Sequence, residues 1–169
     1  MQENIKLRPI KKADCLAISQ AFEKQGWDKP VAQYENYLLF QKSGERDVIV
    51  ACVNNEFVGY LTVKWTSDYP YFKEKNIPEI VDFNVLKKYQ RLGIGSKLMD
   101  EAETRIRRVS AYAGIGVGLY SDYGPAQILY SNRGYRPDGN GLVKDHFPLQ
   151  KGSVVAIDDS IALYFVKEI

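Results

Sequence analysis

The stretch "EIVDFNVLKKYQRLGIGSKLM", residues 79–99, joins a β-rich run to a helical one through a loop with two glycines. The apolar positions of its first seven residues predict a strand, and the later apolar residues have helical spacing. Unpaired N–H groups and the positive end of the dipole make a helix start an anion site. Gly93 and Gly95 lack Cβ atoms, so a phosphate can approach this backbone closely. The segment therefore predicts a phosphate-binding turn.

Two other phosphate motifs do not match this segment. The pattern GxxxxGK[ST] is absent from the chain, and GxGxxG fails because Leu98 stands where its third glycine belongs. What remains is Gln90-x-x-Gly93-x-Gly95. On its own this pattern also fits the tight packing of a helix against a strand, so a second motif is needed to decide between the two interpretations.

Outward from this segment, apolar periodicity and turn residues predict a mixed sheet with helices on its faces. A right-handed crossover should make the strands at 79–85 and 114–120 parallel, and residues 67–78 should form an aromatic loop. The other expected strands are 5–8, 47–53, 56–65 and 160–169, and the expected helices are 11–25, 31–41, one from about Gly93, and one from 124 that stops at Gly134. The expected apolar face of the central helix is Leu98, Met99, Ala102, Ile106 and Val109.

Composition narrows the class of protein. A chain of 169 residues without repeats or a low-complexity linker predicts one domain over residues 1–169. The net charge of +2 and the lack of a basic stripe argue against nucleic-acid binding, and no apolar run is long enough to cross a membrane. We interpret Arg105, Arg107 and Arg108 as a solvated helix face. Two isolated cysteines and no secretory segment predict a cytoplasmic protein.

Metal and triad chemistry are not expected from this sequence. It has one histidine, His146, and no CxxC or HExxH spacing, so we predict no metal site. His146 lies in a polar, loop-like stretch, and no GxSxG motif accompanies it.

Two motifs together carry a resemblance to a known family. Gln90-x-x-Gly93-x-Gly95 after a strand resembles the signature of the GNAT superfamily of acetyl-coenzyme A-dependent N-acetyltransferases. The block "AQILYSNRGYRP", residues 126–137, is similar to that family's C-terminal A-x-x-x-Tyr-x-x-x-Gly-aromatic segment. The stretch 122–142 looks like a bacterial subgroup, and the order of elements matches over nearly the whole chain. The resemblance implies an α/β (α+β) fold with a mostly antiparallel sheet, a splayed parallel pair of strands, and helices on both faces.

The resemblance also implies that acetyl-coenzyme A is the co-substrate, without a metal. The main chain of Phe83 and Val85 would bind the pantetheine arm like an added strand. The N–H of Val85 would also polarise the thioester carbonyl. The pyrophosphate would be held by the turn formed by Gln90, Arg91, Leu92, Gly93, Ile94, Gly95 and Ser96.

One position departs from the family pattern. The family often has an asparagine seven residues before the motif tyrosine, and Tyr123 stands there in this chain. The departure puts that pantetheine contact in doubt, and Ser121 or Asp122 is an alternative to Tyr123. The glycines at 114, 116 and 118 fit either a strand that bends or is approached closely, or simple tight packing.

Acetyl transfer to an amine needs a base for the amine and a proton donor for the departing thiolate. The resemblance gives Tyr130 as the donor, with a structural tyrosine as the alternative. Glu79 is the candidate base, because some family members carry a glutamate at this position. Strict alternation places Asp82 on the other face of the strand unless a bulge intervenes. Asp82 and a water relay are therefore the alternatives to Glu79.

The predicted function is direct transfer of an acetyl group from acetyl-coenzyme A to a primary amine of a small molecule. No cysteine lies in the motifs, so a covalent acetyl-enzyme is not expected. The alternatives are a protein or peptide N-acetyltransferase and a non-catalytic coenzyme A sensor. The acceptor pocket could be lined by the aromatic loop at 67–78 and by Trp27, Tyr34 and Trp65. The sequence leaves open the identity of the acceptor, the biological role and the oligomeric state, for which a homodimer is one option.

Overall fold

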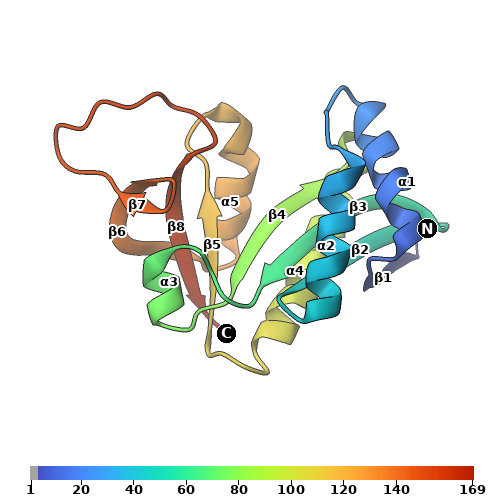
Figure 1. Ribbon diagram of the computed structural model, residues 1–169, viewed down its shortest axis with the longest axis horizontal. Helices are drawn as coiled ribbons and strands as arrows, with labels where there is room; N and C mark the ends of the chain where they lie inside the picture. Colours follow the sequence, from blue (N-terminus) through green and yellow to red (C-terminus); the bar gives the residue numbers. More distant parts are fainter. Residues whose placement is uncertain (1–3) are drawn as a thin grey trace. The chain divides into compact units, whose positions relative to one another are not determined.

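The computed structural model describes residues 4–169, and Figure 1 shows the order of their elements along the chain. These residues divide into two compact units. The first unit contains the chain up to Trp65 together with Val81–Arg105, and the second contains Thr66–Ile80 together with Ile106–Ile169. Among residues 4–169, no helix combines the length and the apolar character that a membrane span needs.

The first unit is built around a β-hairpin. Strands β2 and β3 are antiparallel, and β1 pairs with β2 in the same sense. Asn54 and Asn55 turn the hairpin with φ of 50° and 67°, the positive values that a two-residue turn of this kind requires. The unit's elements are β1 (Ile5–Pro9), α1 (Lys12–Glu23), α2 (Val31–Ser43), β2 (Arg46–Val53), β3 (Glu56–Lys64), most of β4 (Glu79–Val85), the 3-10 turn η1 (Lys87–Tyr89) and α4 (Ile94–Ile106).

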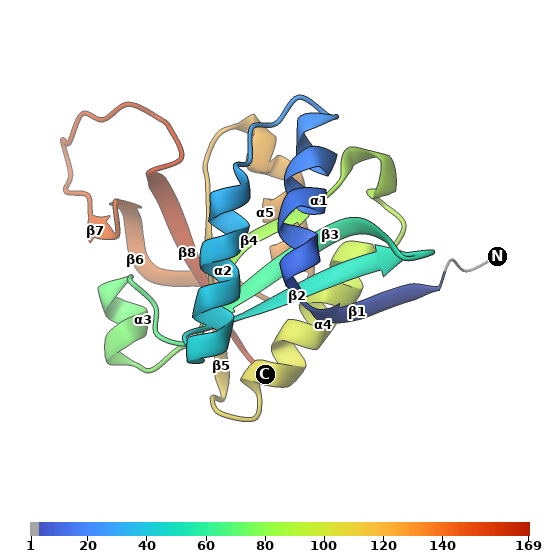
Figure 2. The same ribbon diagram turned by 45° about the vertical axis from the view of Figure 1, so that its right-hand side comes forward.

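Helices cover both faces of this hairpin. Helices α1 and α2 run side by side over β2 and β3, as Figure 2 shows. They bury Ile18, Phe22 and Tyr34 in one cluster with alternate residues of β2, including Val48 and Val50. The intervening residues of β2 point to the opposite face, along which α4 lies (Figure 2).

The second unit contains the other strands. Its elements are the start of β4, α3 (Pro70–Glu74), β5 (Tyr112–Val117), the 3-10 turn η2 (Ser121–Tyr123), α5 (Gly124–Asn132), β6 (Arg136–Lys144), β7 (Phe147–Pro148) and β8 (Ile161–Glu168). Glu79 and Ile80 pair in parallel with Gly114 and Ile115. Strand β8 is antiparallel to both β5 and β6, and β7 is antiparallel to β6.

The strand order in the sheet is β1-β2-β3-β4-β5-β8-β6-β7. In the described part of the chain, β4 and β5 form a parallel pair within a mostly antiparallel sheet. The mixed fold and the parallel pairing of the two strands joined by the crossover, both predicted from the sequence, are confirmed.

Two segments were predicted wrongly. Residues 70–74 form α3 inside the expected aromatic loop, because Pro70 suits the first turn of a helix and Phe72 is fully buried. Strand β6 was missed, since its Asp-Gly-Asn-Gly run at 138–141 is typical of a turn. The two glycines in that run adopt positive φ, and the β6–β8 register shifts across it.

The end of α4 also differs from the prediction. The helix stops at Ile106, so Val109 lies beyond it and is 70% exposed instead of packing in the core. Arg107 and Arg108 follow the helix, and Arg105 forms ion pairs with Asp47 and Glu101 at 2.9 and 2.8 Å. These arginines are therefore not a continuous solvated helix face.

Candidate active site

The turn before α4 presents its backbone to solvent. Arg91 and Gly93 have positive φ of 62° and 81°, and the carbonyl of Gly93 accepts the N–H of Lys97. The N–H groups that precede Lys97 in the first turn have no carbonyl four residues earlier in the helix. A Cβ at Gly93 would meet nothing within 4 Å, so this glycine is required by its backbone angle and leaves open space.

The neighbouring residues of this turn have different roles. A Cβ at Gly95 would lie 3.1 Å from the ring of Phe83, so Gly95 allows α4 to pack on β4. The side chain of Gln90 donates to the carbonyl of Val85 at 3.1 Å and ties the turn to the end of β4. The two interpretations of the glycines therefore apply to different positions, close packing to Gly95 and an open turn to Gly93.

A diphosphate group fits this turn. Residues 86–97 contain four basic side chains and no acidic one. Arg91, Leu92, Gly93 and Ser96 are exposed. The consecutive N–H groups, the open space at Gly93 and the surrounding positive charge are the features that anion sites at helix starts share.

Strand β4 is interrupted in its middle. Asp82 has φ of 53°, a left-handed conformation that breaks the alternation of side chains along the strand. The pairing with β5 involves Glu79 and Ile80, which precede this break. The strict alternation that would place Asp82 on the other face of the strand from Glu79 therefore does not hold at Asp82.

The carboxylate of Asp82 is surrounded by donors. It accepts hydrogen bonds from the side chains of Tyr60, Tyr37, Gln33 and Asn84, and it pairs with Lys29. Burial and the charge of Asp82 raise the pKa values of the Tyr37 and Tyr60 hydroxyls, so both stay protonated and donate. Asp82 would have to release one of these hydrogen bonds before it could accept a proton from an amine.

Glu79 begins β4 and is only 6% exposed, so it is not a solvated carboxylate at a strand end. It accepts a hydrogen bond from the Ser67 hydroxyl, and the Ser67 oxygen in turn accepts the N–H of Tyr69 at 3.0 Å. Burial raises the pKa of the Tyr164 hydroxyl, and the nearby charge of Glu79 raises it further. Glu79 thus lies in an enclosed polar site within the second unit.

Tyr130 lies in α5 and is 5% exposed. Burial alone raises the pKa of its hydroxyl, which therefore stays protonated at neutral pH. Among residues 4–169, no side chain or carbonyl is hydrogen-bonded to this hydroxyl. Its proton is therefore not engaged within the described chain.

Unlike Tyr130, Tyr123 has a hydroxyl that is hydrogen-bonded to another side chain. Its hydroxyl donates to Asp159 at 2.9 Å, and its ring lies where a Cβ on Gly118 would fall, at 2.4 Å. The neighbouring alternatives, Ser121 and Asp122, are both exposed. The assignment of Tyr123 to pantetheine binding stays a prediction.

The glycines of β5 make room for aromatic rings. A Cβ at Gly114 would lie 2.2 Å from the ring of Phe72, and one at Gly116 would lie 3.0 Å from the ring of Tyr164. Of the two interpretations that the sequence left open, tight packing describes these positions.

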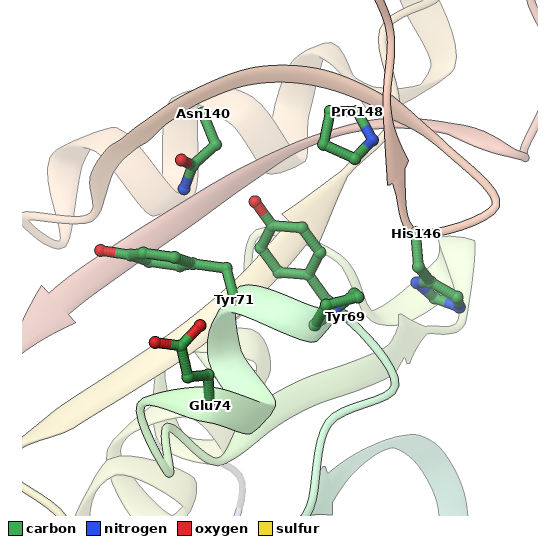
Figure 3. A pocket seen from close by; sticks show the side chains of 7 residues that line it. Tyr69, Tyr71, Glu74, Asn140, His146 and Pro148 are labelled. Atoms are coloured by element: carbon green, nitrogen blue, oxygen red, sulfur yellow. The ribbon is translucent and has the colours of Figure 1, made fainter.

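A pocket of about 380 Å³ lies between α3 and the β6–β7 hairpin, as Figure 3 shows. The Tyr69 ring stacks on Tyr164 with centroids 3.9 Å apart, and its hydroxyl donates to Asp138 at 2.8 Å. His146 Nδ1 lies 2.8 Å from the Tyr164 hydroxyl. The lining residues are Tyr69, Pro70, Tyr71, Glu74, Asn140, His146 and Pro148.

The sequence anticipated this pocket only in part. Aromatic residues of the segment 67–78 do line it, but His146 and Asn140 carried no pattern that would place them there. Trp27 and Tyr34 instead belong to the core of the first unit, where Trp27 stacks on Phe22 at 5.7 Å. Trp65 donates its indole N–H to Asp47 at 3.2 Å. Residues 4–169 contain no cluster of three or more His, Cys, Asp or Glu side chains able to hold a metal ion.

Comparisons with known proteins agree on one family. The model of the acetyltransferase (GNAT) family matches residues 14–135. An uncharacterised N-acetyltransferase from Archaeoglobus fulgidus is 31% identical over 109 residues, which cover 63% of this chain and 73% of that protein.

Solved structures share the fold at low sequence identity. An N-acetyltransferase from Staphylococcus aureus has a TM-score of 0.71 at 13% identity, covering 98% of both chains. A ribosomal-protein-alanine N-acetyltransferase from Brucella melitensis has a TM-score of 0.70 at 17% identity, covering 97% of this chain and 99% of that one. The Salmonella typhimurium protein yncA, solved with its cofactor acetyl-CoA, has a TM-score of 0.68 at 18% identity, covering 97% and 93%. With the family match over most of its length, the chain belongs to the acetyltransferase (GNAT) family and is an acyltransferase.

Proposed function

We propose that this protein transfers the acetyl group of acetyl-coenzyme A directly to a primary amine of a small molecule. The turn before α4 is the observation that carries the proposal. Its backbone is exposed, its flanking side chains are basic, and the space at Gly93 is open. These are the requirements for binding a diphosphate, which is the charged group at the centre of coenzyme A.

Acetyl-coenzyme A, when bound, supplies the thioester acetyl group that the amine nitrogen attacks. The N–H groups of residues 91–96 bind the pyrophosphate, and Gln90 holds the turn through its bond to Val85. The main chain of Phe83 and Val85 binds the pantetheine arm as a strand would. The Val85 N–H stabilises the negative charge that develops on the carbonyl oxygen.

Two proton movements complete the reaction. Glu79 accepts the proton that the amine loses as the new C–N bond forms, and Tyr130 donates one to the sulfur as the C–S bond breaks. The enclosed site of Glu79 and the unengaged, protonated hydroxyl of Tyr130 support these roles. Asp82 is less suited to act as the base, because its oxygens already accept hydrogen bonds. A water relay is the remaining alternative.

The pocket in the second unit supports a small-molecule acceptor. Its volume of about 380 Å³ is in the range of small-ligand sites. It offers aromatic faces together with one carboxylate, Glu74, which favours a cationic amine. Hydrogen bonds also link the pocket's wall to the candidate base, since Tyr69 lines the pocket and Ser67 bonds to both Tyr69 and Glu79.

A protein acceptor is the second candidate. The fold neighbour from Brucella melitensis is named as an enzyme that acetylates a ribosomal-protein alanine. At 17% identity this similarity shows that the two proteins share a fold, but it does not show that they share an acceptor. A short peptide with a free amino terminus is the probe that separates this candidate from the first.

Thiol release tests the proposal. The protein is incubated with acetyl-coenzyme A and, in separate arms, with small primary amines, with short peptides and with no acceptor. Faster thiol release with at least one small amine is expected. Release with peptides alone would move the acceptor to the protein class. Tight acetyl-coenzyme A binding without release in any arm would favour the non-catalytic sensor.

We treat residues 1–169 as one acetyltransferase domain of a cytoplasmic protein that does not bind nucleic acid. A homodimer stays a prediction, and sedimentation of the purified chain at several concentrations would test it.

A further inference from the structure

The middle of β4 contains a residue in a conformation that strands do not normally adopt. Asp82 has φ of 53°, and the residues that bracket it, Glu79–Val81 and Phe83–Val85, belong to the same strand. Asparagine and aspartate are the non-glycine residues that enter this region most readily. Something must nevertheless hold the break in one place, because an ordinary strand would continue without it.

The carboxylate of Asp82 provides that hold. The Tyr37 hydroxyl donates to it at 2.8 Å and the Gln33 amide at 2.9 Å, both from α2. The Asn84 amide donates at 2.7 Å, and the Tyr60 hydroxyl donates from β3. The donors thus come from three elements of the first unit and converge on one side chain.

The donors are themselves fixed. Lys29 Nζ lies 3.3 Å from Asp82 and sits over the rings of Phe22 and Tyr60, at 5.3 and 5.8 Å. The carbonyl of Lys29 accepts the Ser19 hydroxyl at 2.6 Å. The Arg46 guanidinium stacks over the ring of Tyr37, 4.8 Å from its centroid. Donors held this way leave the carboxylate little freedom to move.

The backbone on both sides of the break is held as well. The Thr62 hydroxyl donates to the carbonyl of Val81 at 2.5 Å. A Cβ at Gly59 would lie 2.8 Å from the carbonyl oxygen of Asn84, so β3 approaches β4 very closely after the break. A small change at Asp82 would therefore shift the main chain of the residues that follow it.

We infer that Asp82 is a positioning residue. Its carboxylate fixes the left-handed break in β4 and so sets the main chain of Phe83–Val85 for the pantetheine arm. The inference rests on the proposed function, which assigns that main chain to coenzyme binding. It gives Asp82 a different role from the base, because its oxygens are occupied by the donors that hold the strand.

Comparing the affinities for two ligands distinguishes this positioning role from an effect on the overall stability of the fold. Acetyl-coenzyme A contains the pantetheine arm, whereas 3′-phosphoadenosine 5′-diphosphate keeps the diphosphate and the 3′-phosphate and lacks the arm. We expect Asp82→Ala to bind acetyl-coenzyme A about tenfold more weakly, with its affinity for the diphosphate unchanged. Titration calorimetry at a temperature where circular dichroism shows each variant folded provides both constants.

Further variants identify what the carboxylate contributes. Asp82→Asn should stay within about threefold of wild type, since asparagine enters the left-handed region and its oxygen accepts from the tyrosines. Asp82→Gly should be as weak as Asp82→Ala, because it adopts the angle but has no carboxylate to hold it. If Asp82→Ala does not fold, Tyr37→Phe removes one donor and should weaken acetyl-coenzyme A binding alone, by about twofold to threefold.

Asp14→Ala is the matched control. Asp14 is also a partly buried carboxylate of the first unit, bonded to Arg8 at 2.6 and 2.8 Å. Its loss should lower the melting temperature and leave both affinities unchanged.

Three results would overturn the inference. They are an acetyl-coenzyme A affinity of Asp82→Ala within twofold of wild type, an equal loss for both ligands, and full recovery by Asp82→Gly. Failure of the wild-type protein to bind acetyl-coenzyme A would instead reject the proposed function.

Discussion

The carboxylate of Glu79 accepts a hydrogen bond from the hydroxyl of Ser67, and both side chains are buried. The bond links the first residue of β4 to the segment that leads into α3. The Ser67 oxygen also accepts the N–H of Tyr69, a residue that lines the pocket, so two hydrogen bonds link the candidate base to the segment that forms one wall of the pocket.

Replacing Glu79 by Gln should lower the turnover number by about 10²-fold at pH 7. The loss should shrink as the pH rises toward about 10, where an alkylamine deprotonates without help. The measurement is kcat across this pH range for the wild type and the variant, with the best acceptor found. Ser67→Ala is the control, since it keeps the carboxylate and should show a smaller, pH-independent loss. A constant ratio of the Glu79→Gln and wild-type rates across pH would assign the base role to Asp82 or water.

Replacing Gly93 by Ala should reduce the increase in melting temperature that acetyl-coenzyme A causes, because a ligand that binds only the folded state stabilises it. Ala is strained at a φ of 81° and would distort the turn that presents the N–H groups. Gly44→Ala is the matched control, because Gly44 has φ of 79°, also has nothing within 4 Å, and ends α2. Both variants should lose similar stability without ligand. An equal ligand-induced shift in both would exclude the turn as the phosphate site.

Replacing Gly114 by Ala should destabilise the protein by about 1–3 kcal/mol through overpacking. The new Cβ would lie 2.2 Å from the ring of Phe72, which is fully buried. Gly124→Ala is the control, since nothing lies within 4 Å of its Cβ and it begins α5. Urea unfolding of both variants gives the comparison. Equal stability of Gly114→Ala and wild type would mean that Phe72 can move aside.

Protonation of Asp14 should remove stability in acid. Burial acts to raise its pKa, but hydrogen bonds from Arg8 and from the Lys11 N–H outweigh this and lower it below the ordinary value. The unfolded chain therefore takes up the proton at a higher pH than the folded one. The stabilisation is fully present above about pH 4 and is lost as the pH falls through the folded-state pKa. The free energy of unfolding of Asp14→Asn should lie about 1–2 kcal/mol below wild type at pH 7 and approach it near pH 2.

Most elements of the fold followed from local patterns in the sequence. The Asn54-Asn55 turn and Gly44 after α2 each need a positive φ that their residue types allow, so the hairpin and the helix end could be predicted. Strand β6 could not, because a Gly-rich polar run becomes a strand only when β8 supplies its hydrogen bonds. The short helix α3 likewise depends on burying Phe72.

The candidate site, too, could be predicted from the sequence only in part. The glycine turn and Tyr130 stand in motifs that can be identified along the sequence. The break at Asp82 and its donors cannot be identified in this way, because they lie up to 53 residues apart in the chain. Period-two alternation, which is the signal for a strand, predicts the opposite of what β4 does there.

The last prediction concerns Tyr130, a buried residue whose hydroxyl is protonated and makes no hydrogen bond within residues 4–169. Tyr130→Phe removes one oxygen and keeps the ring, so packing and coenzyme affinity should barely change. If the hydroxyl protonates the departing sulfur, kcat should fall by about 10²-fold, the lower end for a positioned general acid, because a thiolate is already a tolerable leaving group. The loss should appear in kcat with the acetyl-coenzyme A affinity unchanged, as for an interaction made in the transition state.

Tyr135→Phe is the control for Tyr130→Phe, since Tyr135 is also buried and its ring lies 6.2 Å from that of Tyr130. Its kcat should stay close to wild type, because no step of the proposed reaction uses its hydroxyl. Steady-state rates and calorimetric affinities of the two variants show whether the Tyr130 hydroxyl takes part in catalysis. A Tyr130→Phe rate within about twofold of wild type would make Tyr130 a core residue and leave sulfur protonation to solvent.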